Sequence, residues 1–306
     1  MQTYQMNAPR RPTAKGRARS LLITDLDNTL YDFVSYYEAG LSAIVTHLSE
    51  QFNLDADEVV CRLREVFKRR GTIEYSIAIQ EIEEVQHLPD ARRIEFVRKV
   101  VTSFWTNATT KLKPYETVCD TLRHLYMHDV AIIAYTDAPI HEAMRRLHHL
   151  QCDQYISGIV AQRGLRRGNK RSVLLLKELP GHIRPSRRSS LVWRTSPQEK
   201  KPNLLIYERI SSKLGFGPDE ITVIGDSIAR DLVPALQLGF TGVWARYGRR
   251  DHSKEGLLRS LVPDVLPEAR PVQDVPPDVP TVDRFQDVLN YLPVQQLLPF
   301  ELTAGS

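Results

Sequence analysis

The stretch LLITDLDNTL, at residues 21–30, joins a short apolar run directly to two carboxylates. Asp25 ends the run and Asp27 follows two positions later. An apolar run without polar alternation is typical of a strand that is buried on both faces of a parallel sheet. A carboxylate at the end of such a strand is costly unless a positive group or a reaction lies beside it. The partners of Asp25 and Asp27 are therefore to be sought further along the chain.

Similar apolar runs recur and are separated by helical patterns. The other predicted strands are VAIIAYTD at 130–137, ISGIVA at 156–161, ITVIGD at 221–226 and TGVWAR at 241–246. Apolar residues three or four positions apart predict helices near 118–126, 140–147, 206–214 and 228–236. This alternation predicts an α/β fold with a Rossmann-like parallel sheet, whose functional groups gather at the carboxyl ends of its strands.

Residues 33–111 interrupt the alternation because they show helical periodicity alone. We therefore expect an inserted helical cap domain at 33–111, between two segments of the α/β core at 20–32 and 112–262. The other expected segments are a disordered basic arm at 1–19, a basic insertion within the core at about 163–200, and a proline-rich strap with a C-terminal helix at 263–306.

Charge is distributed unevenly along the chain. Residues 1–20 contain five basic side chains and no acid, and residues 163–201 contain twelve basic side chains against two acids. These segments carry +5 and +10, and because the whole chain carries +4 the remainder carries −11. The segment 163–201 either binds a polyanion such as nucleic acid, or attracts phosphorylated substrates by its positive potential, or is a solvated loop. These three alternatives stay open.

Composition favours a soluble globular protein, with 42% hydrophobic and 25% charged residues. The first twenty residues lack the apolar segment of a secretory signal, and no apolar stretch is long enough to cross a bilayer. Cys61, Cys119 and Cys152 show no paired spacing, so we interpret them as packing residues in a reducing compartment. We expect a cytoplasmic protein that does not contact membranes.

A second pair of acids follows the predicted strand at 221–226. In ITVIGDSIARD, Asp226 lies at the strand end and Asp231 lies five positions later. Because the carboxyl ends of parallel strands meet at one edge of the sheet, these acids are expected near Asp25 and Asp27. Carboxylates gathered in one crevice repel each other unless a divalent cation lies between them, and oxygen ligands suit Mg²⁺.

A hydroxyl and an ammonium group complete the predicted site. Thr136 ends the strand at 130–137, and Lys201 precedes the helix predicted at 206–214. Together with a turn of backbone N–H groups they would hold the oxygens of a phosphoryl group. In the reaction that follows, Asp25 attacks phosphorus to form an aspartyl-phosphate. Asp27 protonates the leaving oxygen and later deprotonates the attacking water.

Four motifs in this order resemble those of the haloacid dehalogenase superfamily, in its phosphatase branch. They are DLDNT at 25–29, AYTD at 134–137, KKPN at 200–203 and GDSIARD at 225–231. The helical insert resembles the small helical cap of that superfamily, and the resemblance covers about residues 20–250. Asn28 departs from the usual pattern, because many members have glycine there.

The resemblance implies a role for each matching residue. It implies Asp25 as the nucleophile, Asp27 as the acid and base, and Thr136 and Lys201 as phosphoryl-binding groups. It implies Mg²⁺ as the cofactor, held by the Asp25 carboxylate, the Asp27 backbone carbonyl and Asp226. Asp231 would orient Lys201 or a water beside the metal. The 65 positions between Thr136 and Lys201 exceed the spacing of a minimal member, which leaves Lys200 as an alternative. We choose Lys201 because it directly precedes Pro202, as the motif requires.

The sequence therefore predicts a Mg²⁺-dependent phosphatase that acts on a small phosphorylated metabolite through an aspartyl-phosphate. A phosphomutase or nucleotidase of the same superfamily uses the same core and stays an alternative. The dehalogenase branch has no acid at the position of Asp27, which argues against it. A binding protein that uses residues 163–201 on nucleic acid is the alternative from a different class. The substrate and the oligomeric state stay open.

Overall fold

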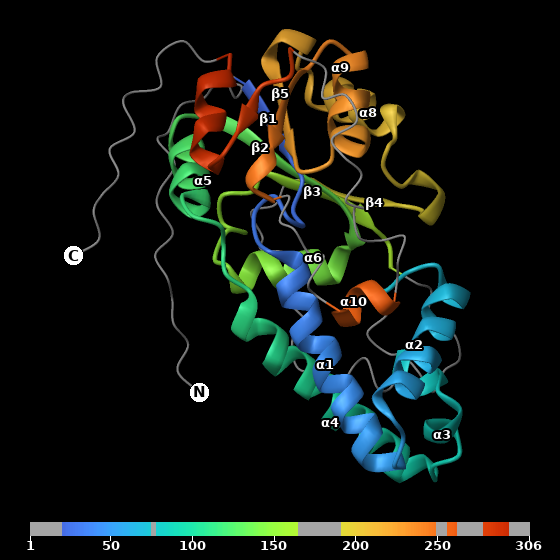
Figure 1. Ribbon diagram of the computed structural model, residues 1–306. Coiled ribbons are helices and arrows are strands. Elements are labelled where there is room, and N and C mark those ends of the chain that lie inside the picture. Colours follow the sequence, from blue (N-terminus) through green and yellow to red (C-terminus); the bar gives the residue numbers. More distant parts are fainter. Residues whose placement is uncertain (1–19, 75–77, 165–190, 249–255, 262–277, 294–306) are drawn as a thin grey trace, which may run out of the picture.

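The computed structural model describes residues 20–74, 78–164, 191–248, 256–261 and 278–293. The basic arm predicted at 1–19 and most of the basic insertion predicted at about 163–200 lie outside the described residues, as does much of the strap predicted from 263. Figure 1 shows a half that contains the sheet and a half made of helices.

One parallel sheet organises the described residues. Its seven strands are β1 (Ser20–Thr24), β2 (Val130–Pro139), β3 (Gly158–Gln162), β4 (Leu191–Thr195), β5 (Ile221–Gly225), β6 (Thr241–Ala245) and β7 (Thr281–Val282). They lie in the order β4-β3-β2-β1-β5-β6-β7. In the central strand, Leu21 is in register with Ala131 of β2 on one side and with Ile221 of β5 on the other. The predicted α/β fold with a parallel sheet is confirmed.

Helices cover both faces of the sheet, because side chains of each strand point alternately to the two sides (Figure 1). On one face, α8 (Leu204–Leu214) and α9 (Val233–Gln237) pack in a cluster with Ile23 and Ile133. On the other, α5 (Val118–Met127) and α6 (Ile140–His149) pack in a cluster with Leu22 and Ile132. Within the described residues, none of the helices combines the length and the apolarity that a bilayer span requires.

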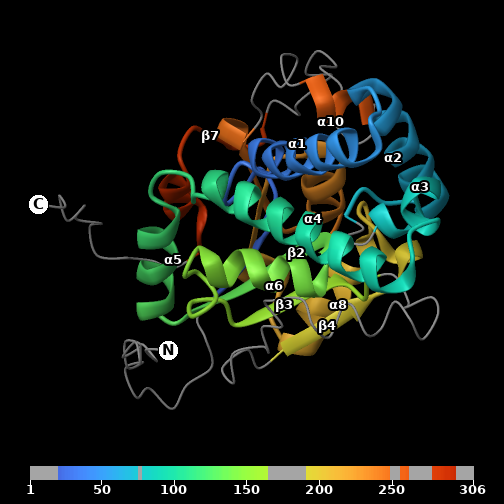
Figure 2. The ribbon, with the colours of Figure 1, turned by 90° about the horizontal axis from the view of Figure 1, so that it is seen from below.

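Further helices lie between β1 and α5 and form what we call the helical insertion. They are α1 (Phe33–Phe52), α2 (Ala56–Arg70), the 3₁₀ helix η1 (Ala78–Glu81), α3 (Glu83–Gln86) and α4 (Asp90–Lys111). Asp32 starts α1 by accepting a hydrogen bond from the backbone N–H of Ser35 at 3.0 Å. Figure 2 shows α1 beside α4. They approach closely at Gly40, where a Cβ atom would lie 2.4 Å from the Phe104 ring.

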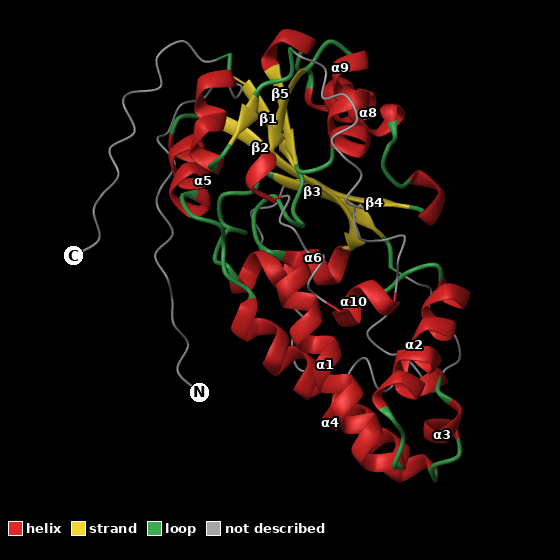
Figure 3. Cartoon of the chain, viewed as in Figure 1, coloured by secondary structure: helices red, strands yellow, loops and turns green. Residues whose placement is uncertain are grey.

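Short elements after β6 differ from the sequence-based division. Helix α10 (Gly256–Leu261) packs against α1 and α2, although the sequence assigned residues up to 262 to the α/β core. The backbone N–H groups of Leu257 and Leu258 donate to the Glu38 carboxylate at 3.0 and 2.7 Å. The C-terminal helix is a 3₁₀ helix over Phe285–Tyr291, which follows the unpredicted strand β7. Figure 3 shows α10 beside the helical insertion.

Candidate active site

Two predicted acids meet where the sheet reverses its strand order. Strands β2–β4 lie on one side of β1 and β5–β7 on the other, so the ends of β1 and β5 open a crevice. Asp25 follows β1, and its backbone N–H donates to the carbonyl of Ile224 in β5 at 2.9 Å. Asp226 follows β5. The carboxylates of Asp25, Asp226 and Asp231 each offer an oxygen that lies within 4.8 Å of the others.

Asp231 is folded back over the end of β5 by a π-helical turn, η4 (Ile228–Leu232). Its side chain is buried, and its Oδ2 accepts a hydrogen bond from the backbone N–H of Ser227 at 3.3 Å. Gly225 makes this possible, because a Cβ atom at that position would lie 2.4 Å from the Asp231 carboxylate. The glycine before Asp226 therefore has a packing role in the site.

Lys201 lies between two of the clustered carboxylates, those of Asp25 and Asp231. Its buried Nζ donates to Oδ1 of Asp25 at 2.6 Å and to Oδ1 of Asp231 at 2.7 Å. Its backbone N–H donates to the carboxylate of Asp137, in the C-terminal part of β2, at 3.1 Å, which fixes the backbone of Lys201 beside that strand. Lys200, the alternative, instead points its Nζ at the carbonyl of Gly71, 3.3 Å away. Of the two lysines, only Lys201 contacts Asp25.

The end of β2 is irregular where Thr136 lies. The register between β2 and β3 shifts between Tyr135 and Pro139. Within this bulge the Thr136 hydroxyl accepts a hydrogen bond from the backbone N–H of Ala138 at 3.1 Å. A bulge redirects side chains at a strand end, and here it turns residues 136–138 toward the acids of the neighbouring strands.

Asp27 lies in the loop between β1 and α1. Oδ1 of Asp27 accepts hydrogen bonds from the Tyr31 hydroxyl at 2.5 Å and from Nη1 of Arg146 at 3.1 Å. The turn that follows Asp27 depends on Asn28, whose φ of 59° lies in the left-handed region that asparagine tolerates better than most residues. Its side-chain oxygen also accepts a hydrogen bond from the backbone N–H of Phe33 at 3.1 Å. Asparagine therefore fits the backbone conformation of this turn.

One cavity of about 370 Å³ joins these groups. All six side chains that the sequence singled out line it: Asp25, Asp27, Thr136, Lys201, Asp226 and Asp231. The helical insertion contributes the opposite wall through Phe33 and residues 71–74. The cavity thus lies between the sheet and the helical insertion.

The electrostatics of this cavity fit a divalent cation. Burial raises the pKa of Asp25 to about 7, against the attraction of Lys201 and with the repulsion of Asp231. The pKa of Asp226 also lies well above its ordinary value, mainly because the side chain is buried and next because the negative charge of Asp25 repels it. Among the described residues, the ammonium group of Lys201 is the one that contacts these clustered carboxylates. Lys201 pairs with one oxygen of Asp25 and one oxygen of Asp231. Its single positive charge is therefore shared, and the clustered carboxylates still offer oxygen donors of the kind that a divalent cation such as Mg²⁺ takes.

Arg146 and Glu74 are among the residues at the site that were not predicted from the sequence. Arg146 on α6 contacts Asp27, and Glu74 lines the cavity from the helical insertion. The sequence does contain a signal for Arg146. It has the helical spacing of the buried residues Ala143 and Leu147 in α6 and of Leu150, which directly follows α6. A charged side chain at such a position requires a buried partner. Glu74 has no comparable signal, because it lies outside any helix or strand.

Comparisons with known proteins agree with the fold. The family model described as haloacid dehalogenase-like hydrolase matches residues 20–239. Among curated proteins no match was found. A solved 2-haloacid dehalogenase from Pseudomonas syringae pv. tomato DC3000 has a TM-score of 0.53 at 12% identity, and the match covers 89% of this chain and 96% of that one. A HAD phosphatase from Thermococcus onnurineus has a TM-score of 0.49 at 14% identity, covering 89% and 97%. At such low sequence identities, the likeness to these structures shows the fold alone.

Proposed function

This chain belongs to the haloacid dehalogenase-like hydrolases, and from that premise we propose that it is a Mg²⁺-dependent phosphatase acting on a small phosphate monoester. The observation that carries the proposal is the pairing of two carboxylates in one loop with different partners. Asp25 pairs with Lys201 at 2.6 Å, whereas Asp27 pairs with Arg146 and Tyr31. Two acids in different environments suit a nucleophile and a proton donor.

The residues present fit Mg²⁺, which would be held by the carboxylates of Asp25 and Asp226 and the backbone carbonyl of Asp27. When bound, the ion neutralises negative charge on the phosphoryl oxygens and on the clustered carboxylates. Burial is the main cause of the raised pKa values of Asp25 and Asp226, and neighbouring carboxylates raise them further. A bound divalent cation would favour the charged form of both groups, which supports this assignment.

In the first step, a carboxylate oxygen of Asp25 attacks phosphorus and the bond from phosphorus to the leaving oxygen breaks. The Lys201 ammonium and the Thr136 hydroxyl hold the non-bridging oxygens of the phosphoryl group. Asp27 gives its proton to the leaving oxygen, which departs as an alcohol. The product of this step is an aspartyl-phosphate at Asp25 and a carboxylate at Asp27.

In the second step, Asp27 takes a proton from water while the water oxygen attacks phosphorus. The bond between Asp25 and phosphorus breaks, inorganic phosphate leaves, and both aspartates return to their starting states. Asp27 thus works first as an acid and then as a base. The volume of about 370 Å³ for the whole cavity suits a small ester.

The test is release of inorganic phosphate from a panel of phosphate monoesters by the purified chain, with Mg²⁺ or with EDTA. We expect hydrolysis that requires Mg²⁺. The Asp25→Asn variant should lose at least about a thousandfold in kcat, because an amide is a poor nucleophile, while keeping the melting temperature of a folded protein.

Other outcomes identify the rival activities. Equal hydrolysis in EDTA, or an active Asp25→Asn variant, contradicts the proposal. Release of halide from haloacids without phosphate release identifies a dehalogenase. Movement of a phosphoryl group between two positions of one substrate, without net phosphate release, identifies a phosphomutase.

A further inference from the structure

A fully buried arginine lies beside the proposed proton donor. The Arg146 side chain is 1% exposed and belongs to α6, on the sheet side of the molecule. Its Nη1 lies 3.1 Å from Oδ1 of Asp27, and its Nη2 lies 2.7 Å from Oε2 of Glu74. One guanidinium group therefore joins the loop after β1 to the helical insertion.

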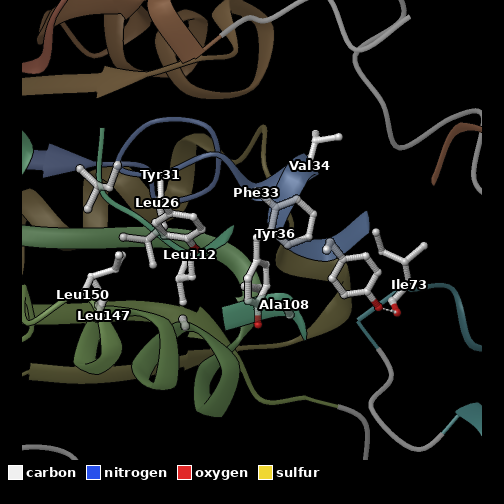
Figure 4. Packing of buried hydrophobic residues seen from close by; sticks show 14 of the residues in the cluster. Leu26, Tyr31, Phe33, Val34, Tyr36, Ile73, Ala108, Leu112, Leu147 and Leu150 are labelled. Atoms are coloured by element: carbon white, nitrogen blue, oxygen red, sulfur yellow. Dashed lines mark hydrogen bonds between the residues drawn. The ribbon is translucent and has the colours of Figure 1, made fainter. Parts of the chain in front are cut away.

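Aromatic rings enclose this guanidinium group. The carbon between its nitrogens lies 5.8 Å from the ring centre of Tyr31, 5.2 Å from that of Phe33 and 5.7 Å from that of Tyr36. Figure 4 shows these three rings among the buried residues near the start of α1. Burial opposes the charge of Arg146, but Asp27 and Glu74 outweigh it, so the pKa stays above its ordinary value. Arginine is suited to such a place because its planar group stacks on rings and bridges two carboxylates.

The hydrogen bonds of Asp27 are divided unequally between its two oxygens. Oδ1 accepts from both Tyr31 and Arg146, whereas no donor among the described residues bonds to Oδ2. A carboxylate held in this way presents one fixed oxygen and leaves the other for a proton. Because Arg146 lies next to Asp27, it also stabilises the negative charge that develops there as the proton leaves.

Arg146 acts on the cavity only through its neighbours. Asp27 and Glu74 line the cavity, and within the described residues Arg146 does not. Burial raises the pKa of Glu74 to about 8 in spite of Arg146. Oε2 of Glu74 accepts a hydrogen bond from Nη2 of Arg146 at 2.7 Å. The contact between Glu74 and Arg146 spans 72 positions of sequence and crosses from the helical insertion to the sheet side.

We propose that Arg146 is the positioning residue for proton transfer by Asp27, and that Glu74 holds Arg146 in place from the helical insertion. Protonation of the leaving group then depends on a contact between the two halves of the molecule. The inference rests on the proposed phosphatase function, since it concerns the proton that the leaving oxygen receives.

The test compares two esters of similar size that differ in their need for a proton. Nitrophenyl phosphate has a leaving group that departs without protonation, whereas phenyl phosphate needs the acid. We expect Arg146→Lys to lower kcat for phenyl phosphate at least about tenfold more than kcat for nitrophenyl phosphate, with KM nearly unchanged. Arg145→Ala is the matched control. It removes a charge from the neighbouring position, where Arg145 stacks 3.9 Å from the Trp105 ring centre, and should leave the ratio of the two esters unchanged.

Chemical rescue and the partner residue separate positioning from folding. In Arg146→Ala, added methylguanidinium should restore activity toward phenyl phosphate at least about fivefold, and uncharged methylurea should not. Glu74→Leu, which removes the acceptor, should show the same selective loss as Arg146→Lys. Glu74→Gln keeps an acceptor and should lose less.

The outcomes distinguish this inference from the proposed function. An active wild-type enzyme whose Arg146→Lys variant loses both esters equally, with a normal melting temperature, overturns the positioning role alone. So does failure of methylguanidinium to act differently from methylurea. A wild-type enzyme that hydrolyses neither ester nor any other phosphate monoester overturns the proposed function, and this inference with it.

Discussion

At the scale of the residue, the burial of Asp25 ties stability to pH. Its pKa is about 7 in the metal-free fold and 3.8 in an exposed aspartate, so between these values the folded protein binds a proton that the unfolded chain releases. The stabilisation from this group is complete below the lower pKa and is lost as pH rises through the higher one. In EDTA, the melting temperature should therefore fall as pH rises from about 4 to about 7. The Asp25→Asn variant should show a smaller fall, and an identical profile would contradict this account.

Gly225 supplies a second prediction at this scale. A methyl group there would displace the Asp231 carboxylate, which lies 2.4 Å from the position of a Cβ atom, and so disturb its ion pair with Lys201. We expect Gly225→Ala to destabilise the fold by about 1–3 kcal/mol and to lower kcat. Gly217→Ala is the control, because its Cβ would meet nothing closer than 3.7 Å. Equal melting temperatures and rates for the two variants would exclude the clash.

The residues at the cavity differ in how well they could be predicted from the sequence. Asp25, Thr136 and Asp226 follow predicted strands, and parallel strands bring their ends to one edge, so their convergence follows from local pattern and topology. Arg146 contacts Asp27 and Glu74 only through tertiary packing, across 119 and 72 positions of sequence. The spacing in α6 indicates that Arg146 is buried, but no local spacing shows which residues it contacts, and Glu74 has no local signal. Both residues were therefore missing from the predicted site.

At the scale of the element, the pairing of α1 with α4 depends on Gly40. Alanine normally stabilises a helix relative to glycine by about 1 kcal/mol. Here its Cβ would lie 2.4 Å from the Phe104 ring, so Gly40→Ala should instead lower the melting temperature in thermal unfolding. Adding Phe104→Leu should relieve the clash and recover part of the loss. A stabilising Gly40→Ala substitution would show that the two helices adjust freely.

Elements were predictable where burial alone determines them. The strands β1, β2, β3, β5 and β6 were all recognised as unbroken apolar runs. Strand β7 has two residues and no such run, and the bulge of β2 depends on its pairing with β3. The place of α10 depends on Glu38, more than 200 positions earlier, which accepts from its N-terminal backbone. The β2 bulge, β7 and the position of α10 depend on tertiary contacts and not on the local secondary-structure propensity of their residues.

At the scale of the whole molecule, charge separates the basic segment from an acidic remainder. Residues 163–201 carry +10 on a chain that is otherwise acidic apart from its first twenty residues. If this charge attracts phosphorylated substrate, replacing Arg184, Arg187 and Arg188 by Gln should raise KM, flatten the salt dependence of kcat/KM and leave kcat within a few-fold. Steady-state kinetics across ionic strengths provides the measurement. A collapse of kcat at unchanged KM would argue for direct participation in the chemical step.

The central place of β1 also governs when activity first becomes possible during synthesis. Leu21 pairs with Ala131 and with Ile221, so the strand that ends at Asp25 acquires its second neighbour only after 200 further residues have been added. Contacts between such distant positions form late and slowly. Under the proposed mechanism, a nascent chain on the ribosome contains the nucleophile Asp25 early but should remain inactive until Asp226 and Asp231 have emerged. The onset of activity during synthesis would then indicate that β5 has been made and has paired with β1.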